Sequence, residues 1–442
     1  MKKLFAYVFL LLTILGANAQ IAPHIARTKT AGIDLVAYKT GVKEVVTFRG
    51  SLPAGDSFAP KDNIAIPTLV GEMLDQGTEK HDKFAIAAQL DSIGAKITFS
   101  VDGVNVNFTG KCLSKDLPVV ISLLAEQLRQ PAFSAVEFDK VKKQLEGDYT
   151  RALESTDFQA KQAFSGTIYP VGHPNYAPPV QEFLAAVKTA TIDQLKKFHT
   201  DYYGPAYANF VVVGDIDPKA LQANVEKSFA GWTGGKARPN FTKAPLADSP
   251  QAKNIFLADK PNVTVILGQA TGLKYTDSGA LALRVGTAIL GSGFTGRLMA
   301  NVRDKEGLTY GIGAAVANDT FADGDWFIRA NFAPALLDKG MTSTKRELDS
   351  WYKDGVTAAE LDRTKSDLVG TFKVGMATTD GMAGAISNAI NRGYDLDWLD
   401  KYPDLINSLT LDQVNAAIKK HIQPANLTVI KAGTVKTPTG EQ

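Results

Sequence analysis

Alternation of apolar and polar residues predicts several strands in the first part of the chain. An early strand is expected over 46–52, and apolar residues recur at every second position over 97–101 and again over 104–108. The Asp102-Gly103 pair between the last two runs is typical of a hairpin turn. A run of apolar residues over 209–213 predicts a short buried strand.

Helical periodicity and capping residues predict long helices between these strands. Ser134 is the expected N-cap of a helix that ends at Leu153, and Glu137 is placed to complete a capping box. An apolar helix is expected over 281–290, and a further helix is expected to end near Glu306. Helices combined with mostly antiparallel strands indicate an α+β fold, with the helices on one face of each sheet.

A glycine- and proline-rich stretch over 231–254 carries few large apolar residues, so we interpret it as an interdomain linker. The halves on either side of it repeat each other weakly. Residues 191–214 and 410–433 share Thr, Asp-Gln, Pro and Gly positions at a constant offset of 219. The sequence therefore predicts two homologous domains, 20–230 and 255–442.

Residues 1–19 have the features of a secretory signal peptide: two lysines, an apolar run, and Ala17-Asn18-Ala19 before Gln20. The apolar run is shorter than the roughly 20 residues that a membrane-spanning helix needs, so cleavage is favoured over a membrane anchor. The protein is then expected to be secreted, with the periplasm as the expected compartment.

Charge and cysteine content exclude several kinds of partner and stabilisation. Loss of residues 1–19 removes two of the 48 basic residues and none of the 46 acidic ones, which leaves a formally neutral chain. A neutral chain gives no electrostatic reason to expect nucleic acid or an anionic membrane as a partner. Cys112 is the only cysteine, so stability must come from hydrophobic cores rather than internal disulfides.

A glycine-rich loop follows the helix expected over 281–290. Its glycines, Gly291, Gly293 and Gly296, allow the backbone to approach another chain closely. Taken alone, such a loop is usually only a turn between helices. The spacing also differs from that of a phosphate-binding loop, and the Lys-Ser/Thr pair of that motif is absent.

Arg303 and Tyr310 are the candidate substrate-binding residues. Gly307 is expected to stop the helix that carries Arg303, and a strand beginning at Leu308 would place Tyr310 and Ile312 on one face. The two side chains could then donate hydrogen bonds in one cleft to a peptide carbonyl or a developing oxyanion. In the alternative interpretation, Arg303 only complements the helix dipole and Tyr310 is a half-buried strand aromatic.

Four segments together, 68–78, 173–174, 198–214 and 291–310, resemble the pitrilysin and mitochondrial-processing-peptidase family of two-domain zinc peptidases. The resemblance covers nearly the whole chain after residue 19. It implies that Arg303 and Tyr310 contact substrate carbonyls opposite a zinc ion, because the family has an arginine and a tyrosine at these positions.

The chain departs from this family where zinc would bind. Thr68, Gly71 and Glu72 stand in place of the first histidine, the general-base glutamate and the second histidine, and Asp148 stands near the third ligand, with Glu146 as the alternative. Two carboxylates without imidazole or a general base do not make a hydrolytic zinc site. The chain has five histidines, and no two have the spacing of a ligand pair on one helix. No metal is therefore expected on this chain.

Two functions are compatible with this pattern. The favoured one resembles the divided peptidases of the family: a homologous partner subunit supplies the zinc, this chain supplies Arg303 and Tyr310, and an unfolded peptide is the substrate, added as a strand to a sheet edge. The alternative is an inactive peptide-binding or scaffold protein that keeps the peptidase fold. A third possibility, a metallopeptidase with an unrecognised site, is the least favoured.

Overall fold

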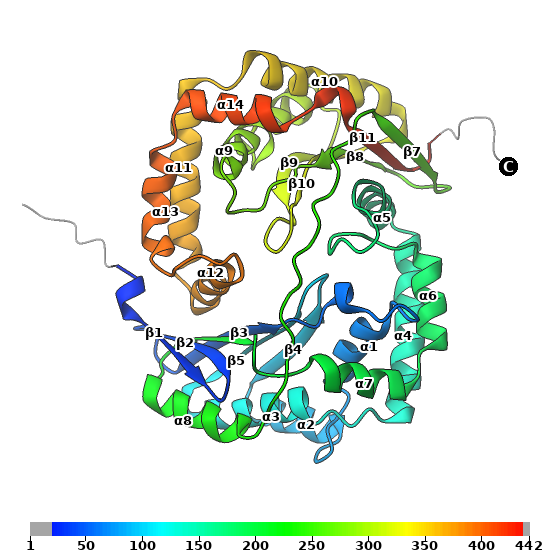
Figure 1. Cartoon of the computed structure of the whole chain (residues 1–442). Coiled ribbons are helices and arrows are strands. Elements are labelled where there is room, and N and C mark those ends of the chain that lie inside the picture. The colour runs from blue at the N-terminus through cyan, green and yellow to red at the C-terminus, as the bar shows by residue number, and fades with distance from the viewer. Residues whose placement is uncertain (1–19, 436–442) are drawn as a thin grey trace, which may run out of the picture.

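A computed structural model describes residues 20–435 and contains two β-sheets, one from each half of the chain (Figure 1). The signal peptide predicted for residues 1–19 lies outside the described residues. The first sheet has the order β1-β2-β6-β3-β5-β4. Its strands are β1 (Ile25–Thr30), β2 (Ile33–Lys39), β3 (Val45–Leu52), β4 (Lys96–Val101), β5 (Val106–Leu113) and β6 (Asn209–Gly214).

The second sheet has the order β7-β11-β8-β10-β9. Its strands are β7 (Gln251–Phe256), β8 (Val263–Ala270), β9 (Gly311–Ala317), β10 (Asp325–Phe332) and β11 (Thr428–Gly433). Neighbouring strands are antiparallel in both sheets except for β2 with β6 and β7 with β11. Apart from β1, the two sheets share one topology, and the predicted α+β class is confirmed.

Helices enclose both sheets. The first half contributes α1 (Ile66–Met73), α2 (Lys83–Ser92), α3 (Leu117–Arg129), α4 (Ala135–Leu153), α5 (Thr156–Ile168), α6 (Val180–Thr189), α7 (Ile192–Tyr202) and α8 (Pro218–Phe229). The second half contributes α9 (Ala280–Gly291), the π-helical turn η4 (Met299–Lys305), α10 (Leu337–Asp354), α11 (Ala358–Gly375), α12 (Thr379–Asn391), α13 (Trp398–Asn407) and α14 (Leu411–His421). Among the described helices, none is both long and apolar enough to cross a membrane.

The two faces of the first sheet belong to different cores. In β6, Phe210 and Val212 pack in the main core with the helices of their own half, whereas Val211 and Val213 point the other way. That second face is covered by α12, through residues such as Ile386. The opposite faces follow from the alternation of side chains along a strand.

The second sheet receives a helix from the first half in the same way. Helix α5 packs on β8 and β11, where Phe164 lies in one cluster with Ile266 and Ile430. The halves therefore exchange helices reciprocally. Helices lie on one face of each sheet, as predicted, but the other face is covered as well, by a helix from the other half.

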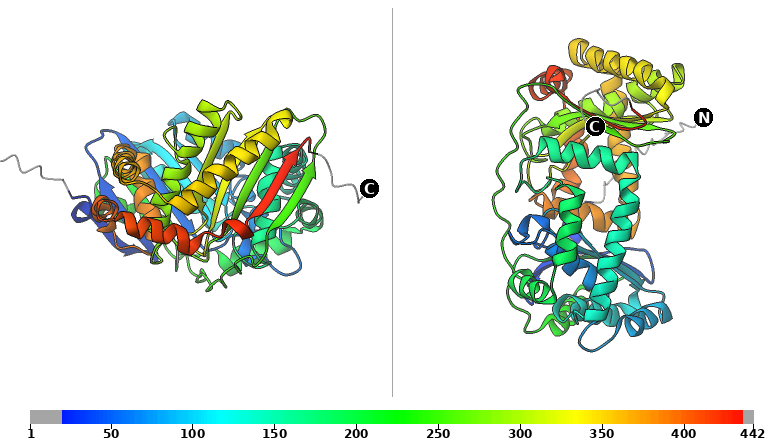
Figure 2. Two further views of the ribbon diagram at one scale, coloured as in Figure 1. Left: turned by 90° about the horizontal axis from the view of Figure 1, so that it is seen from above. Right: turned by 90° about the vertical axis from the view of Figure 1, so that its right-hand side faces the viewer.

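Two local predictions need correction. Ser134 is the N-cap residue of α4, but its side chain makes no capping hydrogen bond. The carboxylate of Glu137 pairs with Lys83 and Lys140 instead of completing a capping box. The predicted linker over 231–254 contains no helix or strand up to Pro250, but β7 then begins within it. In the side view of Figure 2 the extended part of this segment runs along one side of the molecule and joins the two halves.

Candidate functional site

Helix α1 carries Thr68, Gly71 and Glu72, which the sequence resemblance aligns with a zinc motif. Thr68 lies on the accessible side of the helix and donates a hydrogen bond of 2.9 Å from its hydroxyl to Oδ1 of Asp56. A threonine hydroxyl in a hydrogen bond with a carboxylate does not replace an imidazole as a zinc ligand.

Gly71, which the same resemblance aligns with the general base, is buried against β4. A Cβ atom at Gly71 would lie under 3.0 Å from Cγ2 of Val101. Val101 is the last residue of β4, and α1 packs directly on this strand. No side chain can therefore project from residue 71 unless β4 or Val101 moves.

The remaining motif positions are acidic. Partial burial raises the pKa of Glu72, and the neighbouring Asp75 and Asp148 carboxylates raise it further. Asp148 also forms an ion pair with Arg151 one turn along α4. Across residues 20–435, no group of three or more histidine, cysteine, aspartate or glutamate side chains is arranged to hold a metal ion.

Three of the five histidines have other partners. His81 contacts Glu126 at 2.8 Å, His173 is buried against Asp323 at 3.2 Å, and Nε2 of His199 lies 2.9 Å from the carbonyl of Leu128. Burial lowers the pKa of His199. The three rings thus have three separate partners and do not converge on one metal site.

The glycine-rich loop between α9 and η4 depends on its glycines for two reasons. Gly291 ends α9 against the backbone of Ala314 in β9, where a Cβ atom would clash with the main chain. Gly293 has a positive φ of 62°, which favours glycine. The loop is also fixed at its far end, because Arg297 binds both carboxylate oxygens of Glu360 at 2.7 Å.

Arg303 lies between two exposed aromatic rings. Its guanidinium carbon is 5.2 Å from the centre of the Tyr310 ring and 5.5 Å from that of Phe294. Tyr310 and Phe294 are 89% and 74% exposed. Among the described residues the guanidinium has only a 4.0 Å contact with Asp304 and no hydrogen bond. Its donors are thus available to a ligand, and the flanking rings restrict where it can point.

The predicted strand register at Tyr310 is wrong. Strand β9 begins at Gly311, and Ile312 points into the core while Tyr310 points to solvent, so the two do not share a face. The reason is local: the hydroxyl of Thr309 accepts a hydrogen bond of 3.1 Å from the Gly311 N–H and makes a bend where a strand was expected. Gly307 has a positive φ of 63° and its N–H bonds to the carbonyl of Arg303, as expected of a helix stop.

Phe294 was not singled out from the sequence. A large aromatic residue inside a loop of three glycines was the available signal, because such a loop has no core of its own in which to bury a phenyl ring. The structure brings this ring together with the two residues that were predicted.

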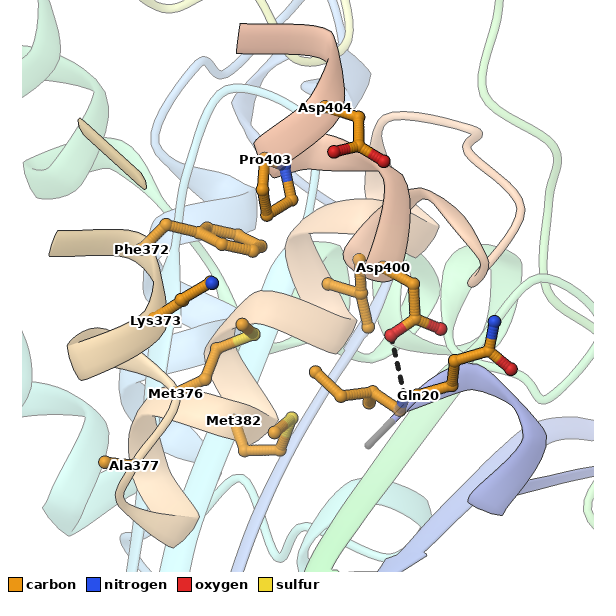
Figure 3. Close-up of a pocket in the computed structure, with 11 residues that line it drawn as sticks. Gln20, Phe372, Lys373, Met376, Ala377, Met382, Asp400, Pro403 and Asp404 are labelled. Atoms are coloured by element: carbon orange, nitrogen blue, oxygen red, sulfur yellow. Dashed lines mark hydrogen bonds between the residues drawn. The ribbon is translucent and has the colours of Figure 1, made fainter. Parts of the chain in front are cut away.

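A pocket of about 500 Å³ lies elsewhere, between the start of the described chain and the ends of α11 and α13 (Figure 3). Its apolar side is formed by residues such as Phe372, Met376 and Met382. Asp400 at its rim accepts hydrogen bonds from the backbone N–H groups of Ile21 and Ala22 at 2.7 and 3.0 Å. This carboxylate therefore anchors the N-terminal segment, and none of the predicted site residues lines the pocket.

Comparison with known proteins identifies both halves. Residues 36–171 match the family model described as insulinase (peptidase family M16), and residues 189–368 match that of the peptidase M16 inactive domain. An uncharacterized zinc protease of Streptomyces coelicolor is 24% identical over 78% of this chain and 76% of its own length. The protein YmxG of Helicobacter pylori, described as a non-peptidase homolog, is 22% identical over 87% of both chains.

Solved structures show the same fold. A peptidase M16 inactive domain from Pseudomonas fluorescens superposes with a TM-score of 0.85 and 22% identity, covering 95% of this chain and all of that one. The residues at the zinc-motif positions cannot perform the zinc chemistry, and no His-x-x-Glu-His sequence occurs in the 442 residues. The chain therefore belongs to peptidase family M16.

Proposed function

We propose that this chain is the non-zinc subunit of a secreted, periplasmic heteromeric metallopeptidase. In this proposal, a homologous partner carries the zinc motif, and this chain contributes Arg303 and Tyr310 to the partner's active site. The substrate is an unfolded peptide that joins a sheet edge as an added strand, and β4 and β9 end the two sheets.

The geometry around Arg303 is the observation that carries the proposal. A guanidinium that has no hydrogen bond in the described chain, held between two exposed aromatic rings, is arranged to receive a carbonyl oxygen. In the tetrahedral intermediate that oxygen becomes negatively charged, and Arg303 would stabilise it while the phenol of Tyr310 donates a second hydrogen bond. The partner's zinc-bound water would be the nucleophile.

The alternative is an inactive peptide-binding or scaffold protein. The packing of Val101 against Gly71 fits this alternative and the subunit proposal equally, because neither needs a base at residue 71 of this chain. Under this alternative Arg303, Tyr310 and Phe294 still bind peptide, but mixing this chain with a homologue that carries the zinc motif adds no cleavage.

The experiment that separates the two uses a tag on this chain. The chain is produced together with a secreted homologue that carries His-x-x-Glu-His, purified through the tag, and assayed on a pool of unfolded peptides, with each chain also assayed alone. Activity only in the co-purified pair supports the subunit proposal. Full activity of the partner alone, or failure to co-purify, contradicts it and favours the scaffold.

A further inference from the structure

A second pocket, of about 260 Å³, lies between the first sheet and helix α12. Helix α12 packs on β3 and β6, and Figure 1 shows it on the side of the first sheet that faces the other half. The pocket is mostly polar, although it lies within the fold. Its polar lining residues include Arg49, Ser51, Asn209, Ser387, Asn388 and Asn391.

Three polar atoms in this lining have no hydrogen-bond partner among the described residues. They are Nε of Arg49, Oδ1 of Asn209 and Oγ of Ser387. Asn209 and Ser387 are only 4% and 9% exposed. Buried polar atoms in folded proteins are almost always hydrogen-bonded, so three partnerless atoms around one pocket favour a polar occupant.

Two of the other polar groups in the pocket are already engaged. The amide nitrogen of Asn209 donates to Ser51 at 2.9 Å and to Asn391 at 3.2 Å. The charge of Arg49 is balanced by Asp380, whose carboxylate accepts a hydrogen bond of 2.7 Å. Among its buried partnerless atoms the pocket thus offers an acceptor, Oδ1 of Asn209, and donors on Arg49 and Ser387, without an excess charge. This combination suits a neutral group that has both an N–H and a C=O.

The size of the pocket restricts the occupant further. Pockets for drug-sized molecules are roughly 300–1,000 Å³, so this one accommodates a single side chain. Gly384 of α12 lines it, and a Cβ atom there would be in ordinary contact, 3.8 Å from the guanidinium carbon of Arg49. The absence of a side chain at residue 384 keeps the space above Arg49 open.

We propose that this pocket binds the neutral carboxamide side chain of a glutamine or asparagine in an unfolded peptide. The amide N–H of the ligand donates to Oδ1 of Asn209, and its carbonyl accepts from Nε of Arg49 and the hydroxyl of Ser387. The inference rests on the proposed function in taking a peptide as the ligand, and it adds a sequence preference to it.

The test measures binding to this chain alone. Three fluorescent nonapeptides that differ only in a central Gln, Glu or Leu are titrated with the protein and followed by anisotropy. We expect the Gln peptide to bind at least about fivefold more tightly than the other two, the range of one or two good hydrogen bonds. Arg49→Lys keeps the charge opposite Asp380 but removes Nε, and Ser387→Ala removes a hydroxyl that makes no other bond; each should reduce the preference to less than twofold.

One control and one further pocket variant keep the result interpretable. Ser366→Ala removes a hydroxyl on the exposed side of α11 and should leave the preference for the Gln peptide intact. Gly384→Ala should keep the fold and weaken binding of the Gln peptide. Equal affinities for the three peptides, no binding of the Gln peptide, or a crystal structure with that peptide present in which the pocket holds only water would overturn the proposal. Because the assay needs neither partner nor zinc, such a failure is distinct from a failure of the cleavage assay.

Discussion

Gly71 and Val101 are packed so closely that a Cβ atom at residue 71 would lie under 3.0 Å from a methyl group of Val101. The sequence resemblance aligns this helical position with the family's general base. In this chain the hairpin strand β4 fills the space beside the helix. The packing of α1 on β4 therefore leaves no room for a side chain at residue 71.

Gly71→Ala should lower the free energy of unfolding by about 1–3 kcal/mol through overpacking. Alanine is otherwise favoured over glycine inside a helix by up to about 1 kcal/mol, so a loss identifies the clash. Urea unfolding of Gly71→Ala, Val101→Ala and the double variant forms a mutant cycle. We expect the double variant to be more stable than the sum of the single effects implies; strictly additive effects would contradict the packing argument.

Restoring the histidines and glutamate of the zinc motif by mutation should not restore zinc binding. The wild-type chain and the triple variant Thr68→His, Gly71→Glu, Glu72→His should both hold far less than one zinc per chain, because Val101 blocks residue 71 and displaces the helix. Metal analysis after dialysis against zinc measures this, and adding Val101→Ala should increase the zinc content. Stoichiometric zinc on the wild-type chain would contradict the account.

Local patterns predicted the elements around the zinc-motif positions and around Arg303. The β4–β5 hairpin, β6, α9 and the stop at Gly307 follow from short-range alternation, apolar runs and glycine chemistry, and they are confirmed. The face of Tyr310 was not predictable from alternation, because one hydrogen bond from the Gly311 N–H to the Thr309 hydroxyl changes the register.

Long-range packing was less visible in the sequence. Helix α12 was not singled out from the sequence, and nothing local says that it covers the sheet of the other half. The pocket beside α12 is of the same kind, because Ser387 of α12 meets Arg49 and Asn209 of the paired strands β3 and β6 only through this exchange of helices. Sequence therefore indicated what each element is, and tertiary structure decided which element it meets.

The exchange of helices predicts that the halves do not fold alone. Without α5, the faces of β8 and β11 that carry Ile266 and Ile430 are uncovered, and without α12 the same holds for Val211 and Val213. Fragments 20–250 and 251–442, produced separately, should lack a cooperative thermal transition, and coexpression should restore it. A single fragment that melts as sharply as the full chain would contradict the reciprocal arrangement.

Asp325 should make stability depend on pH. It accepts hydrogen bonds from Tyr169 at 2.9 Å and Asn318 at 2.7 Å, yet burial raises its pKa from 3.8 to about 6. The native state therefore holds a proton that the unfolded state releases, so this stabilisation is present below about pH 4 and is lost as the pH rises to about 6.

Comparison with Asp325→Asn isolates this contribution. The wild-type advantage in unfolding free energy should fall by up to about 3 kcal/mol between pH 4 and pH 7, since one pKa unit corresponds to about 1.4 kcal/mol. Urea unfolding at several pH values measures the difference. A constant difference over this range would mean that Asp325 keeps an ordinary pKa.

The central claim is that Arg303 acts in a partner's active site, and the direct measurement is peptide cleavage by the co-purified pair with Arg303→Ala in this chain. We expect kcat to fall by about 10²–10³, the usual effect of removing an oxyanion donor. Zinc content and co-purification should not change. As a control, the pair with Arg27→Ala, which removes an exposed arginine on β1, should cleave the peptides at the wild-type rate. Unchanged turnover by the Arg303→Ala pair would contradict the account.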